Sequence, residues 1–360
     1  MSEKLDFKVI ECGGTPYEIG YAHGSQAKDE IMNSIKTYAD MFTTYGNMDW
    51  EIAKRLSKNY IRFIEQFDKD LMEEIRGLAE GAGLDIYDIL ALNARSEVIL
   101  MKGNEHLTDG CTSVSATPDA TRKGYTFLAQ NWDWKASQIA SVIVLKINQE
   151  NLEKPNVTMV TEAGIIGKVG FNSCGVGVCL NALGTKGHHN GVPLHVILRG
   201  ILNSRKISDA VECINWLPNA CAANFMIGSS CGEVLDIEKT PWDFDGIYPK
   251  DGVMAHANHF LTERLRAQDT SRFMAPDSLL RYGVADKLLH EHKGNIDENI
   301  IKAILSDHRD YPDSICAHED PLDRPSYRMC TVFSVVMNLT NLKMELLKGK
   351  PCEGEYKLVE

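Results

Sequence analysis

The spacing of apolar residues along the chain changes near residue 110. Before that point, apolar residues recur at intervals of three and four, which predicts helices that each carry one apolar stripe. One such series is Ile52, Leu56, Tyr60, Phe63, Ile64 and Phe67, and similar stripes run through 71–78 and 86–98. Short helices are marginal alone, and their stripes must be buried. Residues 1 to about 105 are therefore predicted to form a helical layer on a larger body.

After residue 109 the period switches to two, and β-branched or aromatic runs bounded by turn residues predict strands. The predicted strands are 111–116, 124–134, 141–147, 157–162, 164–172, 174–183, 223–227, 234–238, 253–258 and 329–337, followed by a closing hairpin. Their short connections favour antiparallel pairing. Further helices are predicted at 193–203, 208–217, 277–289 and 297–305. The pattern indicates an α+β protein with a sheet of about ten strands and helices on both faces.

Two helix starts are predicted from local sequence. Thr15, followed by Pro16 and Glu18, has the arrangement of a capping box with proline at the first helical position. Ser208 is predicted to cap the helix 208–217.

Composition and charge exclude several classes of protein. The chain has 360 residues, of which 44% are hydrophobic and 24% charged, as in an ordinary globular protein. A net charge of −12 argues against a nucleic-acid partner, because phosphates are bound by clustered Lys and Arg. With no basic leader and no apolar run of about 20 residues, we expect no membrane partner and a cytoplasmic protein. The ten cysteines are then expected to be reduced thiols.

Cys111 directly follows Gly110 at the junction between the helical and the strand-rich parts. If the Gly110-Cys111 bond were cut, Cys111 would become an N-terminus that carries both a nucleophilic thiol and a basic α-amine. The alternative is that Cys111 is a small buried apolar residue, as most free cysteines are.

Other candidate residues are less specific. On the strand that ends at 134, alternation places Asn131 and Asp133 on one face and Trp132 and Trp134 on the other. His256 and His259 are three apart on a predicted strand and point to opposite faces, so they should not chelate one ion. No Cys-x-x-Cys pair occurs, and His188-His189 is interpreted as a solvated loop. We therefore expect neither a metal site nor a bound cofactor.

Several motifs together carry a resemblance to a known family. They are 13–24 (GGTPYEIGYAHG), 109–112 (DGCT), 130–133 (QNWD), 161–173 (TEAGIIGKVGFNS), 181–183 (NAL), 256–259 (HANH) and 311–316 (YPDSIC). The chain closely resembles the isopenicillin N acyltransferase family, the acyl-coenzyme A:6-aminopenicillanic acid acyltransferases. This family belongs to the N-terminal nucleophile hydrolases. The resemblance covers nearly the whole chain.

The resemblance implies a fold and a processing event. The fold would be a four-layer αββα sandwich, in which two antiparallel sheets lie between helical layers, as a single domain over 1–360. Autocatalytic cleavage between Gly110 and Cys111 would give a mostly helical segment 1–110 and a segment 111–360. The two chains would stay associated, and the resemblance leaves further oligomerisation open.

The resemblance also assigns roles to residues. Cys111 would be the nucleophile, and Asp133 would position its amine. Asn258 and the backbone N–H of Asn181 would bind the oxyanion, and Arg328 would orient Asp133. Two positions depart from the penicillin enzyme, because Tyr327 replaces a serine and Ala317 replaces an arginine.

The chemistry fits these residue types. A cysteine thiol with a pKa near ~8.5 can pass its proton to an α-amine with a pKa of ~7.7 to 8, so the base accompanies the nucleophile. We expect a self-processing hydrolase or acyltransferase that acts on linear amides, such as N-acyl amines, amino acids or penicillin-like amides, through an acyl-cysteine thioester. An acyl-coenzyme A thioester is an alternative acyl donor. Hydrolysis is expected over transfer, because water at ~55 M competes with any amine that is not specifically bound.

Two other functions stay open from sequence alone. One is a Cys-His hydrolase without chain cleavage, in which His195, His256 or His259 acts as the base. The other is a non-catalytic relative that serves as a binding protein.

Overall fold

The computed structural model describes residues 5–100, 110–186 and 190–359. The first part of the chain contains β1 (Lys8–Gly13) and the helices α1 (Pro16–Gln26), α2 (Lys28–Gly46), α3 (Trp50–Ser57), α4 (Ile61–Phe67), α5 (Lys69–Ala82), α6 (Ile86–Asn93) and α7 (Arg95–Leu100). Helix α1 starts as predicted, since Thr15 Oγ1 accepts from the Glu18 N–H and Glu18 Oε2 accepts from the Thr15 N–H. The predicted helical layer is confirmed.

The strands, β1 included, form two sheets. The eight-stranded sheet contains β1 and then β4 (Val142–Asn148), β5 (Val157–Glu162), β6 (Val169–Asn172), β7 (Val176–Ala182), β8 (Ala223–Ser229), β9 (Val234–Lys239) and β10 (Phe244–Ile247), in that order. The six-stranded sheet has the order β11 (Val253–His256), β2 (Gly110–Ala116), β3 (Phe127–Trp134), β12 (Cys330–Asn338), β13 (Lys343–Lys348) and β14 (Lys357–Val359).

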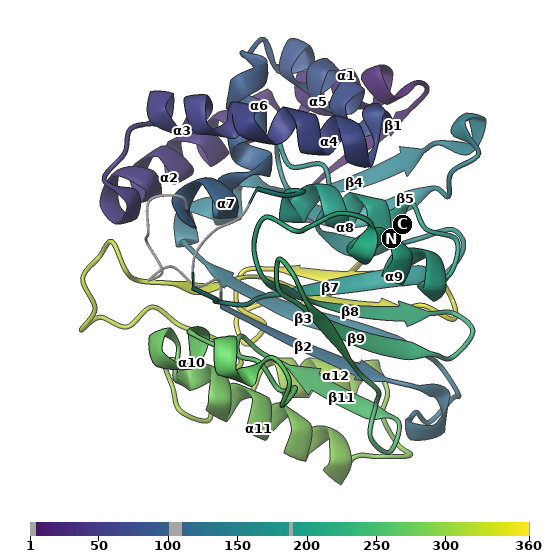
Figure 1. Cartoon of the computed structure of the whole chain (residues 1–360). Helices are drawn as coiled ribbons and strands as arrows, with labels where there is room; N and C mark the ends of the chain where they lie inside the picture. The colour runs from purple at the N-terminus through teal and green to yellow at the C-terminus, as the bar shows by residue number, and fades with distance from the viewer. Residues whose placement is uncertain (1–4, 101–109, 187–189, 360) are drawn as a thin grey trace.

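The elements stack in four layers (Figure 1). Helices α1–α7, with α8 (Leu194–Leu202) and α9 (Ile207–Trp216), lie on one side of the two sheets. Helices α11 (Asp277–Glu291) and α12 (Glu298–Leu305) cover the six-stranded sheet from the other side, and the short α10 (Ser271–Met274) precedes them. The α+β class and the four-layer arrangement are therefore confirmed.

Three details of the sequence interpretation are wrong. The strands divide between two sheets, as the family resemblance implied, rather than forming the single sheet expected from the apolar pattern, because alternation identifies a strand but not the strands it pairs with. Strand β1 pairs in parallel with β4, whereas all other strand pairs among the described residues are antiparallel. Ser208 lies inside α9, whose N-cap is Lys206 without a side-chain capping bond.

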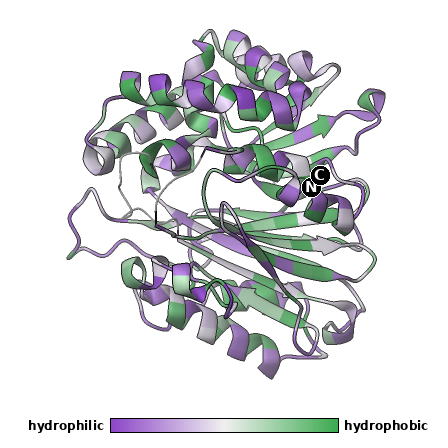
Figure 2. Cartoon of the chain, in the orientation of Figure 1, coloured by the Kyte–Doolittle hydropathy of each residue, from purple (hydrophilic) through white to green (hydrophobic). Residues whose placement is uncertain are grey.

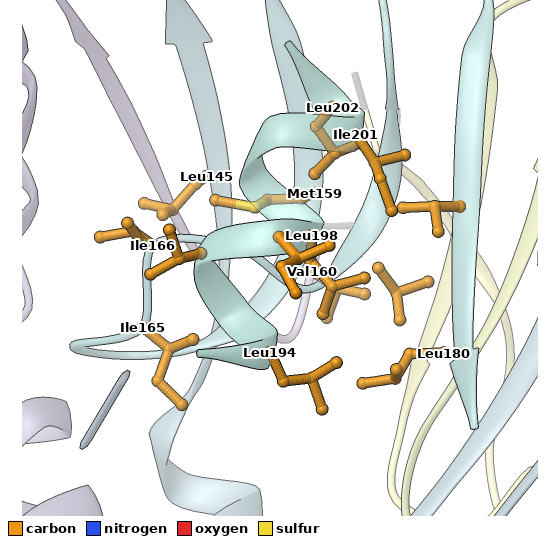
Figure 3. Close-up of a cluster of buried hydrophobic side chains, with 14 of the residues drawn as sticks. Leu145, Met159, Val160, Ile165, Ile166, Leu180, Leu194, Leu198, Ile201 and Leu202 are labelled. Atoms are coloured by element: carbon orange, nitrogen blue, oxygen red, sulfur yellow. The ribbon is translucent and has the colours of Figure 1, made fainter. Parts of the chain in front are cut away.

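Apolar residues concentrate between the layers, while polar residues gather on the outer helix faces (Figure 2). Under α8, a cluster of buried side chains joins this helix to the eight-stranded sheet (Figure 3). Its labelled members are Leu145, Met159, Val160, Ile165, Ile166, Leu180, Leu194, Leu198, Ile201 and Leu202. A second cluster fills the space between the six-stranded sheet and α11 and α12. No helix among the described residues is both long and apolar enough to cross a bilayer.

Strand β3 separates its side chains as predicted. Trp132 and Trp134 belong to the main core, with ring centroids 6.1 Å apart, whereas Asn131 Nδ2 donates to the Leu305 and Ile315 carbonyls on the opposite face. Gln130 links the sheets, because its amide both donates to the Leu180 carbonyl (2.5 Å) and accepts from the Leu180 N–H (2.9 Å). This bond fixes the end of β7 relative to β2 and β3.

Candidate active site

Cys111 is the second residue of β2 and lies at the end of the sandwich where β3, β7 and β11 also end. Its side chain is 1% exposed and belongs to the main apolar core. Its backbone N–H donates to Oδ1 of Asn258 over 2.8 Å. The side chain of Asn258 therefore meets the nitrogen that would become an α-amine after cleavage.

Arg281, on the second turn of α11, holds the same group of atoms. Its Nη1 donates to the Cys111 carbonyl oxygen (2.7 Å) and to Thr112 Oγ1 (3.0 Å), and its Nη2 donates to Asn258 Oδ1 (3.1 Å). Because a guanidinium only donates, the oxygen of the Asn258 amide must face it, and this fixes the orientation of that amide. Sequence analysis missed Arg281, and no sequence signal separates it from other helix-surface arginines.

Arg281 is itself buried and paired. Its Nε donates to Asp277 Oδ2 over 2.8 Å, one helical turn away. Burial alone would lower the pKa of Arg281, but the carboxylates of Asp277 and Asp133 raise it above the ordinary value. A fixed positive charge thus lies beside Cys111 and acts on Asp133.

Asn181 reaches Cys111 from the other sheet. Its Nδ2 lies 3.3 Å from the Cys111 carbonyl oxygen and 3.4 Å from that of His256, and its Oδ1 accepts from Asn224 (3.3 Å). The Nδ2 of Asn258 donates to the carbonyl of the next residue, Ala182 (3.1 Å). The two predicted asparagines therefore flank Cys111, Asn181 from β7 and Asn258 from the segment that follows β11.

Asp133 lies directly opposite Gly110 in the β2–β3 pairing. Its Oδ1 accepts a 2.6 Å hydrogen bond from Thr331 Oγ1, and the residue is 3% exposed. Arg328, predicted to orient Asp133, instead donates to the carbonyls of Pro321 (2.7 Å) and Asp323 (3.1 Å). The structure thus groups Cys111, Asp133, Asn181 and Asn258, and the role of Arg328 stays a prediction.

The candidate histidine bases bond to other groups. His256 Nε2 meets Glu238 Oε1 (3.0 Å) and Nδ1 meets the Ala257 carbonyl (2.8 Å), so both nitrogens donate and the ring is an imidazolium. Burial alone would lower the pKa of His256, but Asp236 and Glu238 raise it.

The other two candidates have depressed basicity. Burial, together with the neighbouring His256 charge, lowers the pKa of His259 to about 4, and burial holds the pKa of His195 well below its usual range. Their Nδ1 atoms bond to Ser278 Oγ (2.7 Å) and the Gly167 carbonyl (2.8 Å). These contacts disfavour a Cys-His pair. Asp109, His188 and His189 lie outside the described residues.

An acidic cleft with a volume of about 210 Å³ opens beside the Gly110-Cys111 bond. Its lining includes Gly110, Asp133, Asp277, Arg281, Asp313, Ala317, His318, Asp320, Asp323 and Tyr327. Burial raises the pKa of Asp313, and the surrounding aspartates raise it further. Both departures from the penicillin enzyme, Ala317 and Tyr327, therefore line a cleft with one cationic guanidinium and five carboxyl groups.

An apolar pocket of about 60 Å³ lies next to the end of β7, where Ala182 lines it. Its apolar lining comes from α2, α7, the end of β3, the segment at the end of β7 and the start of α8, and includes Met41, Phe42, Ile99, Trp134, Ala182, Leu183 and Leu194. Ala182 connects this pocket to the site, since its carbonyl accepts from Asn258. The acidic cleft thus reaches the residue before Cys111, and the apolar pocket reaches the Ala182 carbonyl that Asn258 holds.

Comparison with known proteins places the chain in a class of acyltransferases. Residues 120–351 match the family described as acyl-coenzyme A:6-aminopenicillanic acid acyl-transferase. The acyl-coenzyme A:6-aminopenicillanic-acid-acyltransferase 40 kDa form of Emericella nidulans is 33% identical over 347 residues, which cover 95% of this chain and 92% of that protein. The chain belongs to this acyltransferase family.

Two solved structures are similar at lower identity. A conjugated bile acid hydrolase of Clostridium perfringens has 14% identity and a TM-score of 0.45, over 69% of this chain and 92% of the other. Penicillin V acylase of Agrobacterium tumefaciens has 13% identity and a TM-score of 0.45, over 66% and 83%.

Proposed function

We propose that the protein is a self-processing cysteine amide hydrolase and acyltransferase whose nucleophile is Cys111. The observation that carries the proposal is the set of side-chain hydrogen bonds to the backbone N–H and carbonyl of Cys111. The N–H of Cys111 is held by Asn258, and its carbonyl is held by Arg281 and Asn181, so side chains from the segment after β11, from α11 and from β7 converge on it. A cysteine that served only as core packing would need no such set of contacts.

The proposed cleavage is an N-to-S acyl shift. The Cys111 sulfur attacks the Gly110 carbonyl carbon, the C–N bond breaks, and the nitrogen leaves with the proton of the thiol. Water then hydrolyses the resulting thioester, which releases the Gly110 carboxylate and a Cys111 with a free thiol and amine. Asn258 Oδ1, already 2.8 Å from this nitrogen, would accept from the new amine.

In the processed enzyme, the amine would take the thiol proton while the sulfur attacks a substrate carbonyl. Asn258 Nδ2 uses one hydrogen on the Ala182 carbonyl, and its second hydrogen is left for a developing oxyanion. Asn181 would contribute its backbone N–H. Asp133, held by Thr331, would stabilise the ammonium form of the amine.

The surroundings of Cys111 suggest the substrate class. An acyl group with an apolar chain suits the pocket lined by Phe42, Ile99 and Trp134. The amine part of the amide would occupy the acidic cleft. The aspartates there would repel a carboxylate on the amine, but they would not repel a cationic or neutral amine. We therefore propose hydrolysis as the main reaction, with transfer from acyl-coenzyme A to a carboxylate-bearing amine as a side reaction.

Intact-mass analysis of the denatured protein tests the proposal. Wild-type enzyme should give two fragments separated between Gly110 and Cys111, and Cys111→Ala should stay full length. Cys174→Ala is the matched control, because Cys174 is an exposed thiol elsewhere in the chain. An uncut chain in active wild-type enzyme, or cleavage of Cys111→Ala, would overturn self-processing. A panel of N-acyl amines scored by released amine then defines the substrate.

A further inference from the structure

Four side chains with metal-binding atoms converge at one point near the six-stranded sheet, and one of them, His318, also lines the acidic cleft. They are His308, Cys316, His318 and Cys352, and one ligand atom from each lies within 4.8 Å of every other. His308 follows α12, Cys316 and His318 precede β12, and Cys352 lies between β13 and β14. Three separate segments thus deliver two imidazoles and two thiols to one place.

Three of the six distances among these atoms are close to the edges of a tetrahedral site. With Zn–S near 2.3 Å and Zn–N near 2.0–2.1 Å, the edges of such a tetrahedron are about 3.3–3.8 Å. The Nε2 atoms of His308 and His318 are 3.1 Å apart, and His318 Nε2 is 3.7 Å from Cys316 Sγ and 3.3 Å from Cys352 Sγ. The four atoms therefore surround a space of the size that one zinc ion fills.

We propose that His308, Cys316, His318 and Cys352 form a structural zinc site. Two thiolates and two imidazoles are the ligand set of tetrahedral zinc, and four protein ligands leave no open position for substrate or water. Nδ1 of His318 lies 4.0 Å from Oε1 of Glu353. In zinc sites a carboxylate often orients a histidine ligand from the ring nitrogen that does not bind the metal, and Glu353 has this position.

Backbone bonds hold the ligands in this arrangement independently of any metal. The Cys316 N–H donates to the Asp307 carbonyl (3.0 Å), and the His318 N–H donates to the Pro312 carbonyl (2.9 Å). The segment that carries two of the ligands is therefore folded back on the segment that carries His308.

The residue between two of the ligands connects the zinc site to the candidate active site. The Ala317 N–H donates to Thr331 Oγ1 (3.0 Å), and the Thr331 N–H donates to the Ala317 carbonyl (3.1 Å). Thr331 Oγ1 in turn donates to Asp133. A metal that fixes Cys316 and His318 would thereby fix Thr331 on Asp133, as well as the wall of the cleft formed by Ala317 and His318.

Sequence analysis expected no metal, because the ligands are not arranged as Cys-x-x-Cys pairs. Cys316 and His318 are separated by one residue, His308 lies eight residues before Cys316, and Cys352 comes from a distant loop. All four lie after residue 111, so cleavage at Gly110-Cys111 would leave the site within one chain.

Metal analysis of the full-length protein tests the proposal. Wild-type protein purified without chelator should contain about one zinc per chain. Cys352→Ser and His308→Asn should each lose most of it, whereas the matched controls Cys231→Ser and His292→Asn, at exposed positions, should retain it. Zinc removal by a chelator should lower the Tm of the wild-type protein, and added zinc should restore it.

Cobalt gives a readout that does not depend on the folding of variants. Replacement of zinc by Co²⁺ in the wild-type protein should produce the d–d bands of a tetrahedral ion and thiolate charge-transfer bands. The proposal is overturned if reduced wild-type protein takes up neither zinc nor cobalt, if the ligand variants keep as much zinc as the controls, or if Cys316 and Cys352 are found joined as a disulfide.

Discussion

A Cβ atom placed on Gly110 would lie 2.8 Å from the Cβ of Asp133, which is closer than real side chains approach each other. The two residues face each other across the β2–β3 pair, so a glycine at position 110 is what allows Asp133 to lie against the Gly110-Cys111 bond. The absence of a side chain at Gly110 therefore lets Asp133 lie next to the proposed nucleophile.

The substitution Gly110→Ala should slow cleavage by at least about tenfold, because Asp133 must move by several tenths of an ångström and positioning errors of this size are costly. The rate is measured by intact mass during refolding. Gly283→Ala is the control, since a Cβ there meets nothing within 4 Å. Cleavage of Gly110→Ala at the wild-type rate would show that Asp133 tolerates the shift.

Removal of the Asn258 amide should lower the turnover number of the processed enzyme by a factor of about 100 to 1,000 with a much smaller change in KM. The reason is that an oxyanion donor acts mainly in the transition state. Asn258→Ala is compared with Asn299→Ala, an exposed asparagine on α12, with fragment ratios recorded so that a processing defect is separated from a turnover defect. Near wild-type turnover would assign Asn258 a structural role.

Arg281→Met should lower the processing rate and turnover more than Arg281→Lys does. Lysine keeps the positive charge beside Asp133, but its single ammonium cannot span Cys111, Asn258 and Asp277 as the guanidinium does. We expect losses of about 10-fold for lysine and 100-fold for methionine. Equal losses in the two variants would mean that the positive charge of residue 281 contributes nothing beyond the hydrogen bonds that only the guanidinium makes.

Assays with an acyl-coenzyme A donor and 6-aminopenicillanic acid should give more free acid than acylated amine. The double variant Ala317→Arg, Tyr327→Ser should shift the ratio toward transfer, because it adds a cation to the acidic cleft and removes a bulky phenol. Both products are quantified by mass spectrometry from one reaction. A wild-type excess of acylated amine would reverse our assignment of hydrolysis as the main reaction.

The buried His256 should make stability fall as the pH rises. Asp236 and Glu238 raise the pKa of His256, with His259 as the other titratable neighbour, so the folded state holds a proton that the unfolded state releases. The resulting stabilisation is complete below about pH 6.5 and is lost as the pH rises through the raised value, by up to about 1.4 kcal/mol per pH unit. Denaturant unfolding between pH 6 and 9 should show this slope in wild-type protein and a smaller slope in His256→Gln. Parallel curves would contradict the assignment.

Local features were predictable from sequence, and long-range contacts were not. The capping box at Thr15 involves residues within one helical turn, and the two faces of 131–134 follow from the alternation of neighbouring strand residues. Spacing alone therefore defines both features. Arg281 contacts a carbonyl 170 residues away, and the parallel β1–β4 pair joins strands separated by the whole helical layer. The four proposed zinc ligands come from loops, where no periodicity marks them.

The pairing of β1 with β4 has a consequence for whether the enzyme can refold after it has unfolded. Strand β1 lies before the proposed cut and β4 after it, and the two run side by side over six residue pairs inside one sheet. Before the cut, chain connectivity keeps these strands at high local concentration, so folding is unimolecular. After it, a fully unfolded enzyme would have to recombine two separate chains, at a rate that falls with dilution. The precursor could therefore unfold and refold reversibly, whereas the processed enzyme would depend on kinetic stability. Its lifetime would be set by the rate of its first complete unfolding.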